Sequence, residues 1–377
     1  MTVVSLVLFL LCLAGQALYC FMRPSGPFDS VIYVSLLDGG SQQAYRDAGQ
    51  ACAAALPGPH NQCDASGNSY RQIGAYSPAE WQTFLRFYRV KPLYTGVATV
   101  LHSGLHLPGF LTLRLLSALS FVSAGLTIAF WLRHHLSLPA ACLTTALLVS
   151  FPQVIAIGKF LLPDMFSVAL MLPCLYAIVY MTRKLWVQFL LLALLPLARP
   201  DNIILSLLLG ALLLYRATPD RKRLLLRLAM LFVGCVVFNS LLSRATHGLS
   251  YTILFDHSFL DFSRPSQYPS MRLGLHDYLH TVLTGAPKAI ILFFPLPLFF
   301  TALALSDRTS WQPLRDLVLA ATVSAFARLP LFPAEEERYY TWWLMIAALA
   351  AVATLGQRVL ARPSWYVGTG VNSERLS

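Results

Sequence analysis

Long apolar runs, separated by short polar stretches, are the dominant pattern along the chain. Helices of about 20 apolar residues cross a bilayer core of about 30 Å, whereas a barrel would show short alternating segments. The runs fall roughly at 2–22, 110–132, 138–158, 160–182, 185–198, 202–215, 225–246, 288–306, 316–332 and 339–360. The pattern predicts an all-α polytopic membrane protein with about ten transmembrane helices, forming a single membrane domain over residues 1–377.

Composition supports this prediction and excludes one class of partner. The chain is 56% hydrophobic and only 12% charged, with a mean hydropathy of +0.61. The net charge of +11 would fit a nucleic-acid-binding protein, but the basic residues lie at the ends of apolar runs and not in one patch. We therefore expect membrane lipids as partners and no nucleic acid.

The distribution of charge predicts which side of the membrane each loop faces. With the N-terminus in the cytoplasm, the short outer loops hold only Lys159, Arg199 and Arg338, and most other basic residues outside the two long outer loops are cytoplasmic. This asymmetry follows the positive-inside rule. It predicts a multi-pass protein of a bacterial inner (plasma) membrane with both termini in the cytoplasm. The first run is expected to stay as a span, because bulky Tyr19 precedes Cys20 where lipoprotein cleavage requires a small residue.

Two long loops are predicted on the periplasmic side, at 23–109 and 247–287. The first contains Cys52 and Cys63, which we expect to form a disulfide in that oxidising compartment. Its stretch 93–107 is apolar but short, and His102 and His106 interrupt it, which indicates a surface or dipping helix. The second loop is rich in Tyr, Asp, His and Ser.

The first loop also carries an amphipathic pattern. Ser77, Pro78 and Glu80 form the signature of a capping box with proline at the first helical position. Apolar positions then recur with helical spacing at Trp81, Phe84, Leu85 and Tyr88. This predicts a helix that lies along the membrane surface. The alternative is a helix packed on the loop's own core.

Charged residues at the membrane edge are the candidates for chemistry, because charge inside hydrocarbon is costly. Asp29 and Asp38 follow the first span, where a carboxylate can serve as a general base; a solvated loop residue is the simpler interpretation. Asp164 stands at a predicted helix N-terminus, a position that favours an acid without any catalytic role.

Arginines at the same edge are candidates for binding an anion. Arg199 and Asp201 lie between two runs too short to cross the membrane fully, so the tip of this hairpin can line a cavity at membrane depth. Arg328 and Arg338 flank a proline-broken stretch and are candidates for holding an anionic headgroup. The simpler interpretations are an Arg199–Asp201 pair within the hairpin and snorkelling of Arg328 to the interface.

No P-loop, HExxH or GxSxG motif is present, and the histidines show no metal-ligand spacing. The sequence identifies no cofactor, and no metal ligands are assigned. A divalent ion held by the outer carboxylates remains an open alternative without a supporting motif.

The motifs together resemble the polytopic GT-C glycosyltransferases, which take sugars from polyprenyl-phosphate carriers and work on the outer side of the membrane. The matching motifs are Asp29 with Tyr33, Lys91-Pro92-Leu93-Tyr94, Arg114, Arg199-Pro200 and Glu337-Arg338-Tyr339. The sequence departs from the family in lacking an Asp-x-Asp or Asp-Glu pair in the first loop. It also shows no soluble outer domain after the last run.

The resemblance implies an inverting transfer from a polyprenyl-phosphate-linked sugar to a lipid, glycan or protein acceptor. Asp29, or Asp38 as second choice, would deprotonate the acceptor, and Asp164 would orient the acceptor or a metal. Residues expected to bind substrate are Tyr33, Lys91, Arg199, Asp201, Arg328, Glu337, Arg338 and Tyr339. Alternatives are a transporter or flippase of lipid-linked sugars, an envelope polysaccharide polymerase or ligase, and a non-catalytic membrane subunit.

Overall fold

The computed structural model of the protein is helical wherever it is described. The described residues are 2–26, 28–55, 77–181, 184–249, 251–260, 273–306, 312–334 and 336–359. Within these ranges the extended pairing is confined to one isolated bridge between Ser25 and Phe160. The predicted all-α fold is therefore confirmed.

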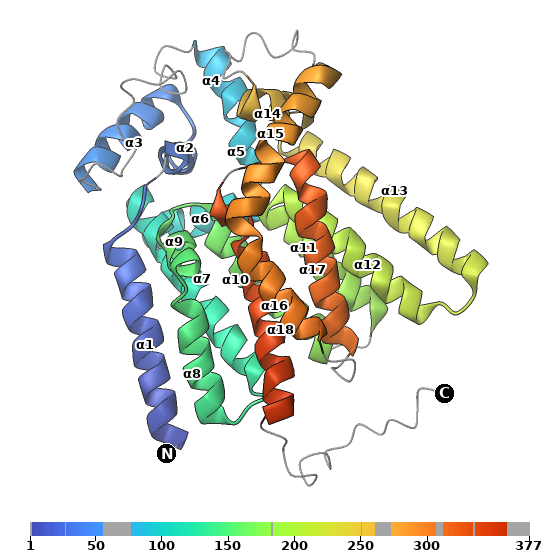
Figure 1. Ribbon diagram of the computed structural model, residues 1–377. Helices are drawn as coiled ribbons and strands as arrows, with labels where there is room; N and C mark the ends of the chain where they lie inside the picture. Colours follow the sequence, from blue (N-terminus) through green and yellow to red (C-terminus); the bar gives the residue numbers. More distant parts are fainter. Residues whose placement is uncertain are drawn as a thin grey trace.

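The helices form a bundle with a smaller cap at the end opposite the N-terminus (Figure 1). The bundle helices are α1 (Thr2–Met22), α7 (Gly109–Leu132), α8 (Leu138–Val149), α9 (Pro152–Lys159), α10 (Pro163–Tyr176), α11 (Leu185–Ala198), α12 (Ile203–Ala217), α13 (Arg221–Ala245), α15 (Leu275–Phe293), α16 (Pro295–Leu305), α17 (Gln312–Leu331) and α18 (Thr341–Val359). The cap contains α2 (Phe28–Leu37), α3 (Gln42–Ala55), α4 (Pro78–Phe84), α5 (Arg86–Arg89) and α14 (Tyr251–Phe259). Helix α6 (Pro92–Leu105) joins the cap to α7.

Each predicted span corresponds to one helix or to a bent pair. Among the described residues, five helices are long and apolar enough to cross a membrane, or up to seven if each bent pair counts as one span. The runs at 138–158 and 288–306 are not straight helices: α8 and α9 meet at 66°, and α15 and α16 meet at 63°. Prolines at 152 and 295 begin the second helix of each pair, because proline cannot continue the preceding hydrogen-bonded ladder.

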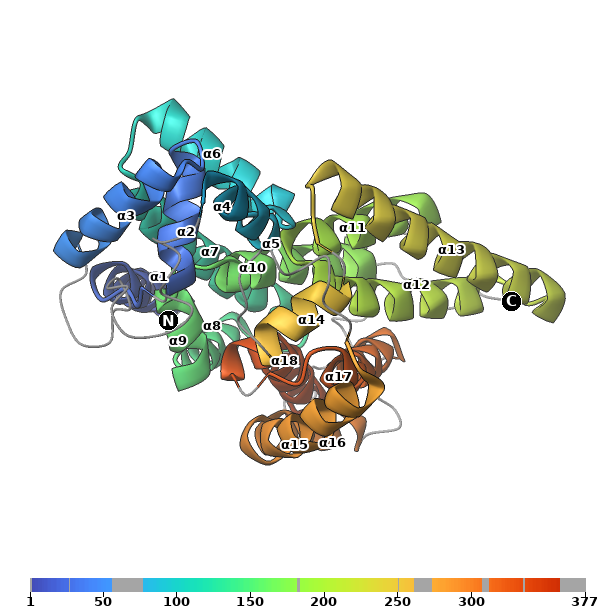
Figure 2. The same ribbon diagram turned by 90° about the horizontal axis from the view of Figure 1, so that it is seen from above.

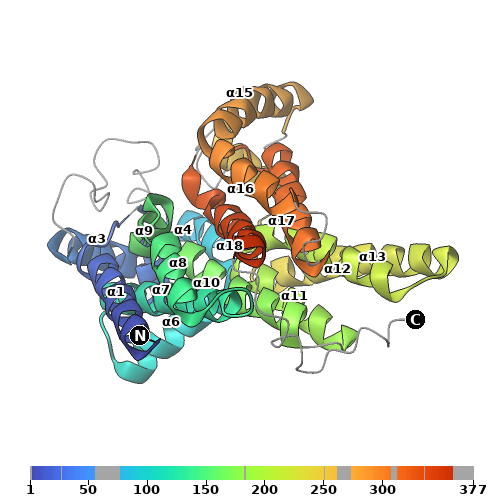
Figure 3. The ribbon, with the colours of Figure 1, turned by 60° about the horizontal axis from the view of Figure 1, so that its bottom comes forward.

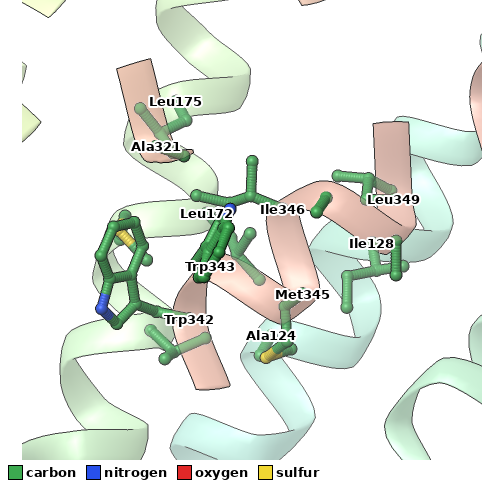
Figure 4. Close-up of a cluster of buried hydrophobic side chains, with 14 of the residues drawn as sticks. Ala124, Ile128, Leu172, Leu175, Ala321, Trp342, Trp343, Met345, Ile346 and Leu349 are labelled. Atoms are coloured by element: carbon green, nitrogen blue, oxygen red, sulfur yellow. The ribbon is translucent and has the colours of Figure 1, made fainter. Parts of the chain in front are cut away.

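Helix α18 lies at the centre of the bundle, between α7 and α10 on one side and α16 and α17 on the other (Figure 3). It is apolar around its whole circumference, which is typical of a fully buried helix. Trp343 and Ile346 of α18 pack with Leu172 of α10 and Ile128 of α7 (Figure 4). Small residues such as Ala347 then allow neighbouring helices to approach closely.

Helix α13 is the opposite case. It stands at the side of the bundle, beside α12 (Figure 2), and none of its most apolar stretch is buried inside the protein. A helix this apolar and this exposed faces lipid.

The cap has a separate hydrophobic core, and this corrects the prediction of a surface-lying amphipathic helix. The expected helix starts at Ser77 with its capping box, but it forms two short pieces, α4 and α5. Trp81, Phe84 and Leu85 are each at most 1% exposed and pack on α2 and α3. The indole Nε1 of Trp81 donates to the carbonyl of Gly40 at 2.9 Å. The apolar face is therefore used by the loop's own core, which was the alternative interpretation.

Cys52 lies buried on α3, whereas Cys63 falls outside the described residues. The Cys52–Cys63 disulfide therefore stays a prediction.

Candidate functional site

Charged residues from six separate segments of the chain meet where the cap rests on the bundle. Helix α2 contributes Asp29 and Tyr33, the α5–α6 junction Lys91, the first turn of α10 Asp164, the α11–α12 turn Arg199 and Asp201, α17 Arg328, and the short 3-10 turn η5 (Glu337–Tyr339) Arg338 and Tyr339. We call this group the arginine cluster.

Arg199 is a buried link between helices of the cluster. Helix α11 ends at Ala198, and Arg199 adopts an extended conformation before Pro200 opens the turn η3 (Pro200–Asn202). Its guanidinium contacts Asp164, which is 4% exposed, and its Nε donates to Asp201 Oδ1 at 3.2 Å. The Asp164 carboxylate stands at a helix N-terminus, as the simpler interpretation of this residue expects, but it is also paired with a buried cation.

Arg328 is joined to the same turn through Asp201. Its Nη1 lies 2.5 Å from Asp201 Oδ2 and donates to the carbonyl of Tyr339 at 3.2 Å. Arg328 is 5% exposed, so the structure contradicts snorkelling to the interface. Its Nε is buried without a hydrogen-bond partner among the described residues, so one guanidinium N–H group is not engaged within them.

Three guanidinium groups surround the ring of Tyr339. The distances from their central carbons to the ring centroid are 5.1 Å for Arg199, 4.7 Å for Arg328 and 5.0 Å for Arg338. Cations are attracted to an aromatic face, but they also repel one another at such separations. A bound anion would relieve that repulsion, and Arg presents forked donors that suit phosphate.

Asp29 lies at the edge of the arginine cluster. The hydroxyl of Tyr88 donates to its Oδ1 at 2.9 Å, and Arg338 Nη1 is 3.8 Å from its Oδ2. Arg338 also contacts the carboxylate of Glu336. Tyr88 and Glu336 were not among the predicted site residues. The sequence marked Tyr88 only as part of an apolar helical face and assigned no role to Glu336.

Lys91 and Tyr33 lie beside Asp29. Lys91 Nζ donates to the hydroxyl of Tyr33 at 2.5 Å and is 5.2 Å and 5.7 Å from the ring centroids of Tyr33 and Tyr88. Burial, together with repulsion by Arg199, lowers the pKa of Lys91 to about 8. The ammonium is thus a cation whose charge is sensitive to mildly alkaline pH.

Three of the residues that the sequence singled out lie apart from the cluster. Asp38 lies just past the C-terminal end of α2, where its Oδ1 is 3.2 Å from His102 Nε2. Arg114 donates to the carbonyl of Ala55 at 2.6 Å. Glu337 is in η5, but its carboxylate makes no hydrogen bond or ion pair with the cluster in the described part of the chain.

The described residues contain no group of three or more His, Cys, Asp and Glu side chains that would hold a metal ion. The buried carboxylates Asp164 and Asp201 are instead engaged by arginines. Four cations, Lys91, Arg199, Arg328 and Arg338, gather here from four different segments, and forked guanidinium donors suit a phosphate ligand.

Comparison with known proteins gives one informative result. No protein-family profile matches the sequence, and no curated protein matches it. Among solved structures, the chain is similar to ArnT from Cupriavidus metallidurans, crystallised with bound undecaprenyl phosphate. The TM-score is 0.50 and the identity 17%, and the match covers 97% of this chain but only 61% of that one. The protein therefore shares the all-α membrane fold of ArnT, and the fold expected from the sequence resemblance is confirmed.

Proposed function

We propose that the protein is an integral membrane glycosyltransferase that moves a sugar from a polyprenyl-phosphate carrier to an acceptor on the periplasmic face. The observation that carries the proposal is the arginine cluster: Lys91, Arg199, Arg328 and Arg338 gather beside the carboxylate of Asp29. The likeness to ArnT, whose structure contains undecaprenyl phosphate, adds support from fold.

The cations match the charge that this reaction develops. When the anomeric carbon–oxygen bond breaks, the bond's electrons remain on the phosphate oxygen, and the leaving polyprenyl phosphate gains a negative charge. Groups aimed at developing charge in a water-poor site stabilise the transition state more than the ground state. Arg328, with its free Nε, is the residue that we assign to this leaving oxygen; Arg199 and Arg338 complete the phosphate site.

Asp29 is placed to act as the general base. It would accept the proton of the acceptor hydroxyl as that oxygen attacks the anomeric carbon from the face opposite the phosphate, with inversion of configuration. The Tyr88 hydroxyl, which donates to Asp29 at 2.9 Å, would hold the carboxylate in position. Asp164 would act through Arg199 by fixing that guanidinium.

The site lies at the end of the bundle opposite the N-terminus (Figure 1). The positive-inside distribution of basic residues puts the N-terminus in the cytoplasm, so the site faces the periplasm. On this assignment the loops 23–109 and 247–287 are periplasmic, and Cys52 and Cys63 are exposed to disulfide-forming conditions.

Undecaprenyl phosphate is the probe that tests the proposal most directly. We expect saturable binding to the purified protein, measured by native mass spectrometry, with undecaprenol binding at least tenfold more weakly because it lacks the phosphate. Equal binding of the two lipids would overturn the phosphate site. A protein that moved lipid-linked sugar between vesicle leaflets without releasing undecaprenyl phosphate would be a flippase instead.

The lowered pKa of Lys91 predicts a pH dependence of donor binding. Lys91 is charged below pH 8 and loses its charge as the pH rises through about 8. The donor KM should therefore rise between pH 7.5 and about 9.5, since a neutral amine attracts phosphate less. In Lys91→Arg the cation persists and the rise should disappear. A wild-type KM that stays constant over this range would contradict the role of Lys91.

A further inference from the structure

A second site lies on the other side of α2 from the arginine cluster. A partly open cavity of roughly 390 Å³ lies between α2, α3, α6 and α7, with Val34, Phe110 and Leu111 in its apolar lining. Asp38, on its rim, follows Asp29 by about two and a half helical turns, so the two carboxylates lie on opposite sides and at opposite ends of α2. The cavity is thus distinct from the proposed catalytic centre.

The polar groups of this cavity have both signs of charge. Asp38 and Asp47 come from the end of α2 and from α3, and His102 and Arg114 from α6 and α7. Asp38 Oδ1 is 3.2 Å from His102 Nε2. One Nη group of Arg114 donates a hydrogen bond to the carbonyl of Ala55. The Nε of Arg114 is buried without a hydrogen-bond partner in the described chain.

The cavity lies at the height where a transmembrane helix enters the membrane. Helix α7 is one of the helices long and apolar enough to span, and it begins at Gly109. Arg114 is therefore in its second turn, at the level of lipid headgroups. Further along α7, Leu115, Leu119 and Val122 are partly or largely exposed and recur every three or four residues. They form an apolar track that leads from the cavity toward the hydrocarbon core.

We propose that this cavity binds the headgroup of a zwitterionic, amine-bearing phospholipid of the phosphatidylethanolamine class. The lipid's ammonium would lie between Asp38 and Asp47, and its phosphate would accept from Arg114. An acyl chain would follow the track on α7. The two carboxylates disfavour a purely anionic lipid, and the apolar lining and track favour a lipid over a water-soluble headgroup analogue.

Native mass spectrometry of the full-length protein tests this assignment. The probes are palmitoyl-oleoyl phosphatidylethanolamine, the matching phosphatidylglycerol, and water-soluble phosphoethanolamine. We expect the wild type to retain phosphatidylethanolamine in preference to phosphatidylglycerol and to retain no phosphoethanolamine. In Asp38→Asn that preference should fall by roughly fivefold, as expected for a partly exposed charge contact.

Arg114→Gln should weaken both phospholipids, whereas Arg46→Gln, an exposed arginine of α3 that does not line the cavity, should change neither. Leu111→Trp fills the cavity without altering its charges and should also lower retention. Equal retention of the two phospholipids by the wild type, or an unchanged preference in Asp38→Asn, would overturn the proposal. These experiments measure lipid binding alone, so their result does not depend on whether the protein transfers sugars.

Discussion

Asp29→Asn is expected to abolish sugar transfer while leaving the protein folded and able to bind undecaprenyl phosphate. The amide has nearly the shape of the carboxylate and still accepts the hydrogen bond from Tyr88, but it does not take up the acceptor's proton. General-base catalysis contributes about a hundredfold to ten-thousandfold, so we expect a fall in kcat of at least a hundredfold. The measurement is release of undecaprenyl phosphate from a lipid-linked sugar donor.

Asp38→Asn is the matched control, since it makes the same change just past the other end of α2, outside the arginine cluster. It should keep nearly full kcat, because Asp38 contacts His102 and not the arginines. An Asp29→Asn protein with near wild-type kcat would rule out Asp29 as the general base. If only Asp38→Asn lost most of its kcat, the reaction centre would lie on the side of α2 that faces Asp38.

The periodicity and length of the apolar runs were sufficient to predict the helical membrane fold, because burial in lipid imposes both on any spanning helix. Bends were not predictable to the same degree. The break between α8 and α9 occurs inside a run that hydropathy alone treats as one segment, and only Pro152 marks it. The burial of Trp81 in the cap core was expected only as the alternative, since an amphipathic pattern does not reveal whether lipid or protein covers its apolar face.

Most residues of the candidate site could be singled out from the sequence, but their arrangement in space could not. Charges next to apolar runs are costly, and this singled out Arg199, Asp201 and Arg328. Their mutual contacts depend on how α10, α11 and α17 pack, which no local pattern encodes. Tyr88 was missed for the same reason, because it contacts the site only through Asp29, which lies far away in the sequence. Glu336 is only two residues from its partner Arg338, but the contact joins the site through the Arg338–Asp29 pair, which depends on tertiary packing.

Two arginines of the cluster should differ in effect: loss of Arg199 should lower both stability and activity, whereas loss of Arg328 should lower activity alone. Arg199→Gln leaves Asp164 buried and without its cation, which costs about 3–5 kcal/mol for a buried pair. We therefore expect a marked loss of thermal stability in detergent. Arg328→Gln leaves Asp201 paired with Arg199, so it should melt close to the wild type but lose about a hundredfold in kcat, because a donor to the leaving phosphate is gone.

The double variant Arg199→Gln with Asp164→Asn gives the decisive comparison. Neutralising both members removes the uncompensated charge, so stability should recover relative to Arg199→Gln alone. Activity should not recover, since the guanidinium near the phosphate is still missing. If Arg328→Gln were as unstable as Arg199→Gln, or if the double variant regained full activity, these arginines would be structural only. Because Arg328 keeps a free Nε where Arg199 is held by two carboxylates, the geometry favours the opposite result.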